Sequence, residues 1–210
     1  IEVISTMGLT DDDIAAVEAV DGIEKAEGGY SLDVLCTEGD NQAAVHVMSL
    51  LPTMNQVQLE EGRLPEAEDE CVVDVDYLNG NSLEIGDTIT FSSGTDDPVT
   101  DSLKTDTFTI VGSVSSPCYI CVPEESFCMD VYTEIYAQVE GAKALTEFTD
   151  EYDQRIGEVL TRVEDISAER EQARYDEIMD EADSELEDAR QELADAEAEL
   201  ADGKAEAEAE

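Results

Sequence analysis

The stretch QARYDEIMDEADSELEDARQELADAEAEL, residues 172–200, has the most regular pattern in the sequence. Large residues recur every seven positions after Gln172, and mostly small residues recur every seven positions after Tyr175. This alternating spacing of three and four persists for four heptads, which is typical of a coiled-coil helix. We therefore predict a helical arm whose seam consists of Met179, Ala182, Leu186, Ala189, Leu193, Ala196 and Leu200.

Alanine at alternate seam positions bears on the kind of partner that the arm needs. In a parallel dimer each alanine would leave a hole where leucine should pack, at a cost of about 2–4 kcal/mol. Two helices that approach closely, as in an antiparallel hairpin, accommodate alanine better. We therefore expect a partner helix, and we expect the returning helix of such a hairpin to lie outside this chain.

Two other interpretations of the arm stay open. Parallel pairing of two copies would bring Glu185 near Arg190, which is favourable, and Glu192 near Glu197, which is repulsive. A single solvated helix, held by charge pairs four residues apart, would need no partner at all.

The residues that open the chain have the pattern of a small sheet domain. Residues 1–6 predict a strand, and Thr10 followed by three aspartates predicts the start of a helix that ends at Gly22. Residues 23–37 and 43–51 predict two more strands. This β-α-β-β opening indicates a sheet with a helix on one face.

The middle of the chain, residues 52–123, is rich in strands and in turns marked by glycine and proline. Strands are predicted at residues 71–75, 87–91, 107–114 and 130–139. From Gly141 the pattern is helical, with a break near residues 165–167. We therefore predict an α+β chain: a small mixed-sheet domain over residues 1–165, then the first helix of an acidic coiled-coil arm over residues 166–210.

Acidic residues dominate the composition. The chain has 55 acidic and 10 basic residues and a formal net charge of −45 at pH 7. Binding to nucleic acid or to anionic lipid headgroups needs clustered lysine and arginine, so this charge argues against both. It favours cations or a basic protein as partners, besides keeping the surface solvated.

Residue types that carry catalysis or bind cofactors do not form a recognisable motif. The single histidine, His46, lies between two valines in a predicted strand, so we interpret it as structural rather than as a general base. The sequence has no glycine-rich phosphate loop. Asp74 and Asp76 begin like a calcium loop, but Leu78 and Ile85 stand where ligands belong. We therefore predict a protein that is not an enzyme, with no catalytic, cofactor-binding or metal-ligating residues.

Two of the five cysteines, Cys118 and Cys121, have the C-x-x-C spacing found in redox and zinc sites. Zinc would need two further ligands nearby, and only Cys128 is close in sequence. A redox pair belongs at a helix N-terminus, whereas a Ser-Ser-Pro stretch precedes this pair. We interpret Cys118 and Cys121 as a candidate disulfide or as inert thiols, with redox and metal roles as alternatives.

The turns of the sheet domain have predicted structural roles. Gly62 and Gly86 permit tight turns, and the Asp87 carboxylate is suited to accept a hydrogen bond from its local backbone. Arg63 has several acidic neighbours, up to Glu70, and is expected to pair with one of them.

Three segments, taken in order, carry a resemblance to a known family. They are EEGRLPEAEDECVVDVDYLNGNSLEIGDTITF at residues 60–91, DTFTIVGSVSSPCYI at residues 106–120 and DVYTEIYAQVEGAKAL at residues 130–145. With their Gly-Arg-x-Pro turn, Ile-Gly-Asp turn and Phe-x-Ile-Val-Gly strand, they resemble the extracytoplasmic, MacB-like core domain of FtsX-like/MacB-like ABC-transporter permeases. The resemblance covers about residues 1–165, and the helix that follows looks like the coiled-coil arm that some Gram-positive members insert.

The resemblance implies a domain at the extracellular face of the bacterial cell membrane, held there by membrane segments outside this chain. Such domains couple ATP-driven movement of the membrane part to export, to sensing or to a partner protein. The implied partners are the remainder of the permease, its ATPase and an extracellular protein that the arm would bind. No cofactor is implied, because ATP would be bound only by the separate ATPase subunit or domain.

A second class of function is a secreted or surface scaffold or adhesion protein that self-assembles through its coiled coil. Concentration-dependent dimerisation of the arm would favour that interpretation. A third class is an enzyme that uses the cysteines, which a thiol pKa well below the usual value would favour.

Overall fold

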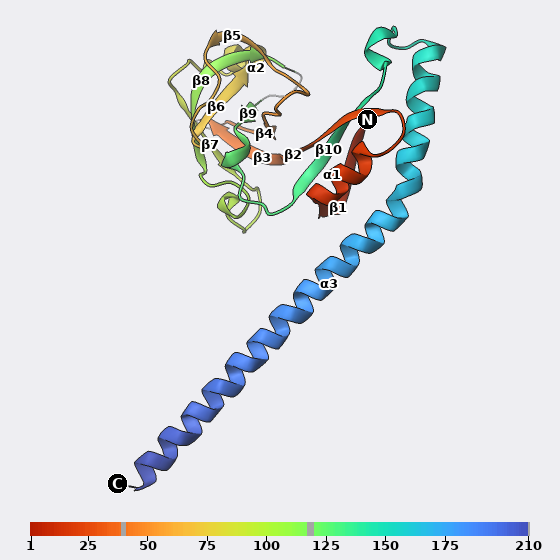
Figure 1. The fold of residues 1–210 in the computed structure, drawn as a ribbon. Coiled ribbons are helices and arrows are strands. Elements are labelled where there is room, and N and C mark those ends of the chain that lie inside the picture. The colour runs from red at the N-terminus through yellow and green to blue at the C-terminus, as the bar shows by residue number, and fades with distance from the viewer. Residues whose placement is uncertain (39–40, 117–119, 210) are drawn as a thin grey trace. The chain divides into compact units, whose positions relative to one another are not determined.

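The structure of this chain is a computed structural model that describes residues 1–38, 41–116 and 120–209. It is α+β, as predicted: strands dominate the first part of the chain, and one long helix follows them (Figure 1). The chain divides into two compact units, Ile1–Val163 and Glu164–Glu210.

A three-stranded antiparallel sheet joins the first and last strands of the first unit. Strand β10 (Tyr132–Val139) lies in the centre, with β1 (Glu2–Leu9) on one edge and β2 (Ile23–Gly29) on the other. Helix α1 (Asp11–Glu18) contacts β2 and β10, and its Val17 is buried. The predicted helix on one face of a sheet is therefore present.

The predicted start of α1 at Thr10 is confirmed. The backbone N–H of Thr10 donates a hydrogen bond to the carboxylate of Asp13 over 2.8 Å, and its hydroxyl donates to the same oxygen over 3.1 Å. Acidic residues in this first turn also suit the positive end of the helix dipole.

The other strands belong to a second sheet: β3 (Ser31–Glu38), β4 (Asn41–Ser49), β5 (Gln58–Gly62), β6 (Glu70–Asp74), β7 (Thr88–Ser92), β8 (Thr107–Ser115) and β9 (Ile120–Val122). Strand β7 pairs with β3 and also with β8, which closes the sheet on itself. Within the described residues, six strands form this barrel in the order β7-β3-β4-β9-β6-β8. Strand β5 pairs with the later part of β8.

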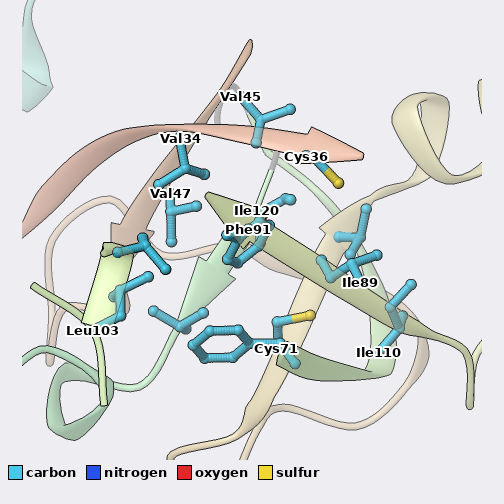
Figure 2. Close-up of a cluster of buried hydrophobic side chains, with 14 of the residues drawn as sticks. Val34, Cys36, Val45, Val47, Cys71, Ile89, Phe91, Leu103, Ile110 and Ile120 are labelled. Carbon is cyan, nitrogen blue, oxygen red and sulfur yellow. The ribbon is translucent and has the colours of Figure 1, made fainter. Parts of the chain in front are cut away.

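The barrel is filled by alternate residues of its strands, because successive side chains of a strand point to opposite faces. Phe91, Cys71 and Ile110 come from three different strands and belong to the buried cluster in this interior (Figure 2). The buried cluster consists of Val34, Cys36, Val45, Val47, Cys71, Val73, Ile89, Phe91, Val99, Leu103, Phe108, Ile110, Ile120, Val122 and Phe127. The barrel is therefore occupied by its own side chains.

The predicted strand at residues 23–37 is in fact two strands in two sheets. Strand β2 ends at Gly29 and β3 begins at Ser31, so Tyr30 is the single residue between these two strands. The Tyr30 ring stacks on Phe127 with centroids 5.1 Å apart, and its backbone N–H donates to Ser49 Oγ over 2.9 Å. The chain stays extended through this crossing, which is why the sequence pattern does not reveal it.

A short helix, α2 (Val75–Gly80), begins at the last residue of the strand predicted at residues 71–75. The Asp74 carboxylate accepts hydrogen bonds from the backbone N–H groups of Asp76 (3.0 Å) and Tyr77 (3.4 Å). Asp74 is therefore a helix cap. Single 3₁₀ turns occur at Val99–Asp101, Glu124–Ser126 and Ala142–Ala144.

Helix α3 (Asp150–Ala209) runs without interruption through residues 165–167, so the predicted break is wrong. Asp165 and Ser167, at the predicted break, are weak helix formers. Their neighbours are mainly strong helix formers, and these tolerate isolated weaker ones.

The start of α3 also differs from the prediction. Only the single 3₁₀ turn Ala142–Ala144 follows Gly141 directly, and the α-helix α3 begins nine residues after Gly141, at Asp150. Thr149 caps it, because its Oγ1 accepts a hydrogen bond from the backbone N–H of Tyr152 over 3.3 Å.

The predicted turn roles are confirmed. Gly62 and Gly86 both have positive φ, +78° and +104°. The Asp87 carboxylate accepts from the backbone N–H of Glu84 over 2.9 Å. Arg63 pairs with Glu70 through both guanidinium nitrogens, one of them at 2.7 Å from the carboxylate.

Candidate interaction surface

The seven predicted seam residues all lie on α3 within the unit Glu164–Glu210, and we call them the α3 seam. Residues seven apart fall on the same face of a helix. Leu186 is 47% exposed, Leu193 61% and Leu200 60%. Large apolar side chains thus form a stripe that is open to solvent, and such stripes commonly mark binding surfaces.

Acidic residues flank the α3 seam on both sides. Residues 164–210 include 20 aspartates and glutamates but only four arginines and lysines. The side that follows each small seam residue carries Asp183, Arg190 and Glu197, and the side that precedes each large one carries Glu185, Glu192 and Glu199. The apolar stripe is therefore bordered mainly by negative charge.

Side-chain pairs along the helix support it without covering the stripe. Gln191 Nε2 donates to Asp195 Oδ1 over 2.8 Å, four residues on. Arg190 Nη1 lies 3.8 Å from the carboxylate of Glu187, three residues back. Each such pair contributes roughly 0.2–0.5 kcal/mol to an exposed helix.

The first turns of α3 are held by the folded unit Ile1–Val163. Val159 is fully buried. Arg162 Nη1 donates to the backbone oxygen of Asp21 over 2.8 Å, and Arg155 Nε donates to that of Glu140 over 3.1 Å. These two acceptors lie just before β2 and just after β10, so the helix is fixed beside two of the strands of the three-stranded sheet.

Gly22 makes this close contact possible. Its φ of +96° lies in a region that L side chains rarely adopt. A Cβ added there would stand 2.7 Å from Val159 Cγ2. The residue that the sequence marks as the end of α1 therefore also provides the surface on which α3 rests.

A buried carboxylate fixes the segment after β4 to the three-stranded sheet. Glu27 accepts hydrogen bonds from the Thr53 hydroxyl (2.6 Å), the Met54 backbone N–H (2.9 Å) and the Thr53 backbone N–H (3.2 Å), and it pairs with Lys25. Burial alone would raise its pKa, but Lys25, Thr53 and Met54 outweigh burial and lower the pKa of Glu27 to about 2. Glu27 is therefore an ionised anchor.

A second buried acid on the same sheet, Glu134, has a pKa that is shifted in the opposite direction. Glu134 lies on β10, and the Tyr136 hydroxyl donates to its carboxylate over 2.8 Å. Burial, and then the neighbouring carboxyl of Glu2, raise the pKa of Glu134, while Tyr136 and the charge of His46 oppose the rise. The protein thus tolerates an ionised Glu134 poorly.

The histidine and the buried Cys71, side chains suited to acid–base and nucleophilic chemistry, lie apart from each other, on the outside and the inside of the barrel. His46 Nδ1 is 2.8 Å from Asp33 Oδ1, and both side chains are exposed on the outside of the barrel. The thiol of Cys71 is buried in the barrel, which raises its pKa and makes it a poor nucleophile. The candidate disulfide falls partly outside the described residues: Cys121 is buried in β9, whereas Cys118 is not described.

Across the described residues, histidine, cysteine, aspartate and glutamate do not gather in groups of three or more that suit a metal ion. Among the helices of this part of the chain, none has the length and the apolar character needed to cross a membrane.

Sequence reasoning proposed the residues of the α3 seam, which stay a prediction, but it missed the groups that hold the first turns of α3. Arg155 and Arg162 belong to the predicted helical region, yet their acceptors are backbone oxygens more than a dozen residues away in sequence. Glu27 had a weak signal, since it is an acid within a strand whose neighbouring residues are small and apolar. No local pattern identifies Thr53 and Met54 as its partners.

No protein-family model and no curated protein matches the chain. Among solved structures, the extracellular domain of the ABC-type transporter YknZ from Gram-positive bacteria is similar, with 13% identity and a TM-score of 0.46 over 66% of this chain and 77% of that one. The periplasmic region of MacB from Actinobacillus actinomycetemcomitans is also similar, with 12% identity and a TM-score of 0.45 over 73% and 71%. The first neighbour is thus described as an extracellular domain and the second as a periplasmic region.

Proposed function

We propose that this chain is the extracytoplasmic domain of an ABC-transporter permease, and that it couples movement of the membrane part to a task outside the membrane. The observation that carries the proposal is helix α3. Its first turns are fixed to a folded unit, and its continuation exposes an apolar face flanked by acid. An element of this kind serves binding and transmission rather than the conversion of a substrate.

The positions of the family-like segments support the transporter part of the proposal. Residues 60–91 supply β5 to β7, residues 106–120 supply β8, and residues 130–145 supply β10. The three segments therefore supply part of the barrel and the central strand of the three-stranded sheet, and the Gly-Arg-x-Pro turn has a defined role through the pair of Arg63 and Glu70.

The state of the reactive groups supports a non-catalytic role. The one hydrogen bond of the His46 ring among the described residues joins Nδ1 to Asp33, and no hydroxyl or thiol is bonded to this pair as a nucleophile would be. Cys71 lies inside the barrel with a raised pKa. The work of the protein is then conformational, and its energy would come from ATP bound by a separate subunit or domain.

The test is to tag the complete gene product in its own cells, isolate membranes and purify it in mild detergent. We expect it in the membrane fraction, together with an ABC-type ATPase identified by mass spectrometry, and we expect ATP hydrolysis by the purified complex. Recovery from the medium as a homo-oligomer without an ATPase would overturn the proposal in favour of the self-assembling scaffold.

A further inference from the structure

We propose that the α3 seam binds, in antiparallel orientation, an amphipathic helix of a different protein segment whose apolar stripe is flanked by lysine and arginine. This inference deepens the proposed function by giving the chemistry of the partner. It depends only on the surface of α3, so it can be tested without the transporter.

The alternation of large and small residues points to the antiparallel orientation. Met179, Leu186, Leu193 and Leu200 recur at one seam position, and three alanines recur at the other. In an antiparallel pair with the same alternation, each large residue of one helix faces a small residue of the other, so the layers fill evenly. In a parallel pair the alanines face each other and leave holes.

The charges beside the α3 seam point to a basic partner. Glu185, Glu192 and Glu199 form a continuous acidic row on one side of it. On the other side Arg190 is the exception among acids, and its guanidinium lies beside Glu187 of the same helix. A helix with lysine or arginine along both edges of its apolar stripe would meet opposite charge along most of the contact.

A second copy of this chain fits the same surface poorly. In an antiparallel pair of copies, the row of Glu185, Glu192 and Glu199 would face its own equivalent, so that every contact on that side is repulsive. The parallel pair avoids part of this repulsion but keeps the alanine holes. Both arrangements would also bring together two segments that each carry 20 acidic and four basic residues.

The experiment uses the full chain and three synthetic 29-residue helices as probes. The first has leucine and alanine alternating at the seam and lysine on both flanks. The second keeps the seam and replaces the lysines with glutamate, and the third keeps the composition of the first but scrambles its seam. Binding is measured by fluorescence anisotropy at low and high salt.

We expect the lysine-flanked helix to bind with a stoichiometry of one to one, and the glutamate-flanked and scrambled helices to bind at least about tenfold more weakly. High salt should weaken the binding without abolishing it, because the apolar part of the contact is not screened.

Two double variants of the chain test the location. Leu186→Glu with Leu193→Glu should weaken binding of the lysine-flanked helix at least about tenfold. Ala194→Glu with Ala198→Glu adds the same charge away from the α3 seam and should leave binding within about twofold. All four positions are exposed, so both variants should keep the helical circular dichroism of the parent.

Equal binding of the scrambled helix would reduce the interaction to charge and overturn the proposal. So would unchanged binding by the Leu186→Glu, Leu193→Glu variant, dimerisation of the chain alone in sedimentation, or binding to phosphatidylcholine vesicles in preference to the helix. None of these outcomes bears on whether the complete protein associates with an ATPase, so the two proposals fail separately.

Discussion

Glu27 is a single carboxylate on which the junction between the two sheets depends. It gathers the hydroxyl and N–H of Thr53, the N–H of Met54 and the ammonium of Lys25 around one buried acid. Hydrogen bonds to a charged group are stronger than neutral ones, and their loss leaves the donors unsatisfied.

Glu27→Gln should therefore lower the free energy of unfolding by on the order of 1–3 kcal/mol at pH 7. The folded pKa, about 2, lies below the ordinary value of 4.5, so the stabilisation is present above pH 4.5 and is lost as the pH falls toward 2. Urea unfolding of parent and variant from pH 7 to pH 3 should show their difference shrinking with acid. Glu18→Gln, at an exposed position of α1, is the control and should change little.

For Glu134 we expect the opposite effect, namely that removing the charge stabilises the fold at neutral pH. Its pKa is raised in the folded protein, so folding is penalised once the pH exceeds the ordinary value of a glutamate, and the penalty grows as the pH rises through the folded pKa. Glu134→Gln keeps an acceptor for the Tyr136 hydroxyl and removes the charge beside Glu2. The variant should unfold at a higher urea concentration than the parent at pH 7.5, and the gain should vanish near pH 4. A variant that is less stable than the parent at pH 7.5 would contradict the prediction that ionised Glu134 destabilises the fold.

At the scale of elements, two glycines give matched tests of how α3 is attached. Gly22→Ala should cost about 1–3 kcal/mol, because alanine disfavours a positive φ and its Cβ would stand 2.7 Å from Val159 Cγ2. Gly157→Ala should instead stabilise by about 0.5–1 kcal/mol, since Gly157 lies within the helix with nothing within 4 Å of an added Cβ.

Hydrogen exchange separates a local effect on α3 from a general one. In Gly22→Ala, exchange should accelerate first in residues 150–163, while the barrel strands keep their protection. Loss of protection in the barrel at the same rate would mean that the base of α3 and the barrel unfold as one unit.

The same elements show where local sequence is sufficient. The alternation at Phe108 and Ile110 predicted β8, and the cap at Thr10 predicted α1, because both signals are local. The three partners of β8, namely β5, β6 and β7, could not be predicted, since those pairings depend on contacts far apart in sequence. The break predicted near residues 165–167 was wrong because isolated weak helix formers such as Asp165 and Ser167 do not end a helix whose neighbouring turns consist of strong ones.

At the scale of the whole molecule, the two units should unfold separately. The unit Ile1–Val163 has the buried barrel core, whereas the helix of the unit Glu164–Glu210 has exposed side chains and strong negative charge. On heating, helical circular dichroism at 222 nm should therefore decline gradually before the near-ultraviolet signal of the folded unit changes. Sodium chloride should raise the first transition, because salt screens repulsion between the acids. Coincident transitions at all salt concentrations would contradict this independence.

The sequence predicted the class of the fold best. It was least informative about which residues of α3 are exposed and how the helix is attached. The heptads placed Leu186 and Leu193 on one helical face, and the structure adds that both are exposed. The sequence could not give the attachment of that helix through Arg162 and Asp21, because the two residues are 141 positions apart.

The arrangement of β1, β10 and β2 determines how the first unit would respond to tension. The Ile1 amino group donates to the oxygen of Ala137 over 2.9 Å, so the chain begins beside the end of β10 from which it continues toward α3. Ile23, the first residue of β2, pairs with Val139 at that same end. A force that pulls Ile1 away from α3 would then break the hydrogen bonds of the β1–β10 and β2–β10 pairings one after another, starting from that end. It would not load all of these hydrogen bonds at once, as a shearing force would. The strands of the barrel lie between β2 and β10 in the sequence, so the barrel would bear the force only after both pairings had separated.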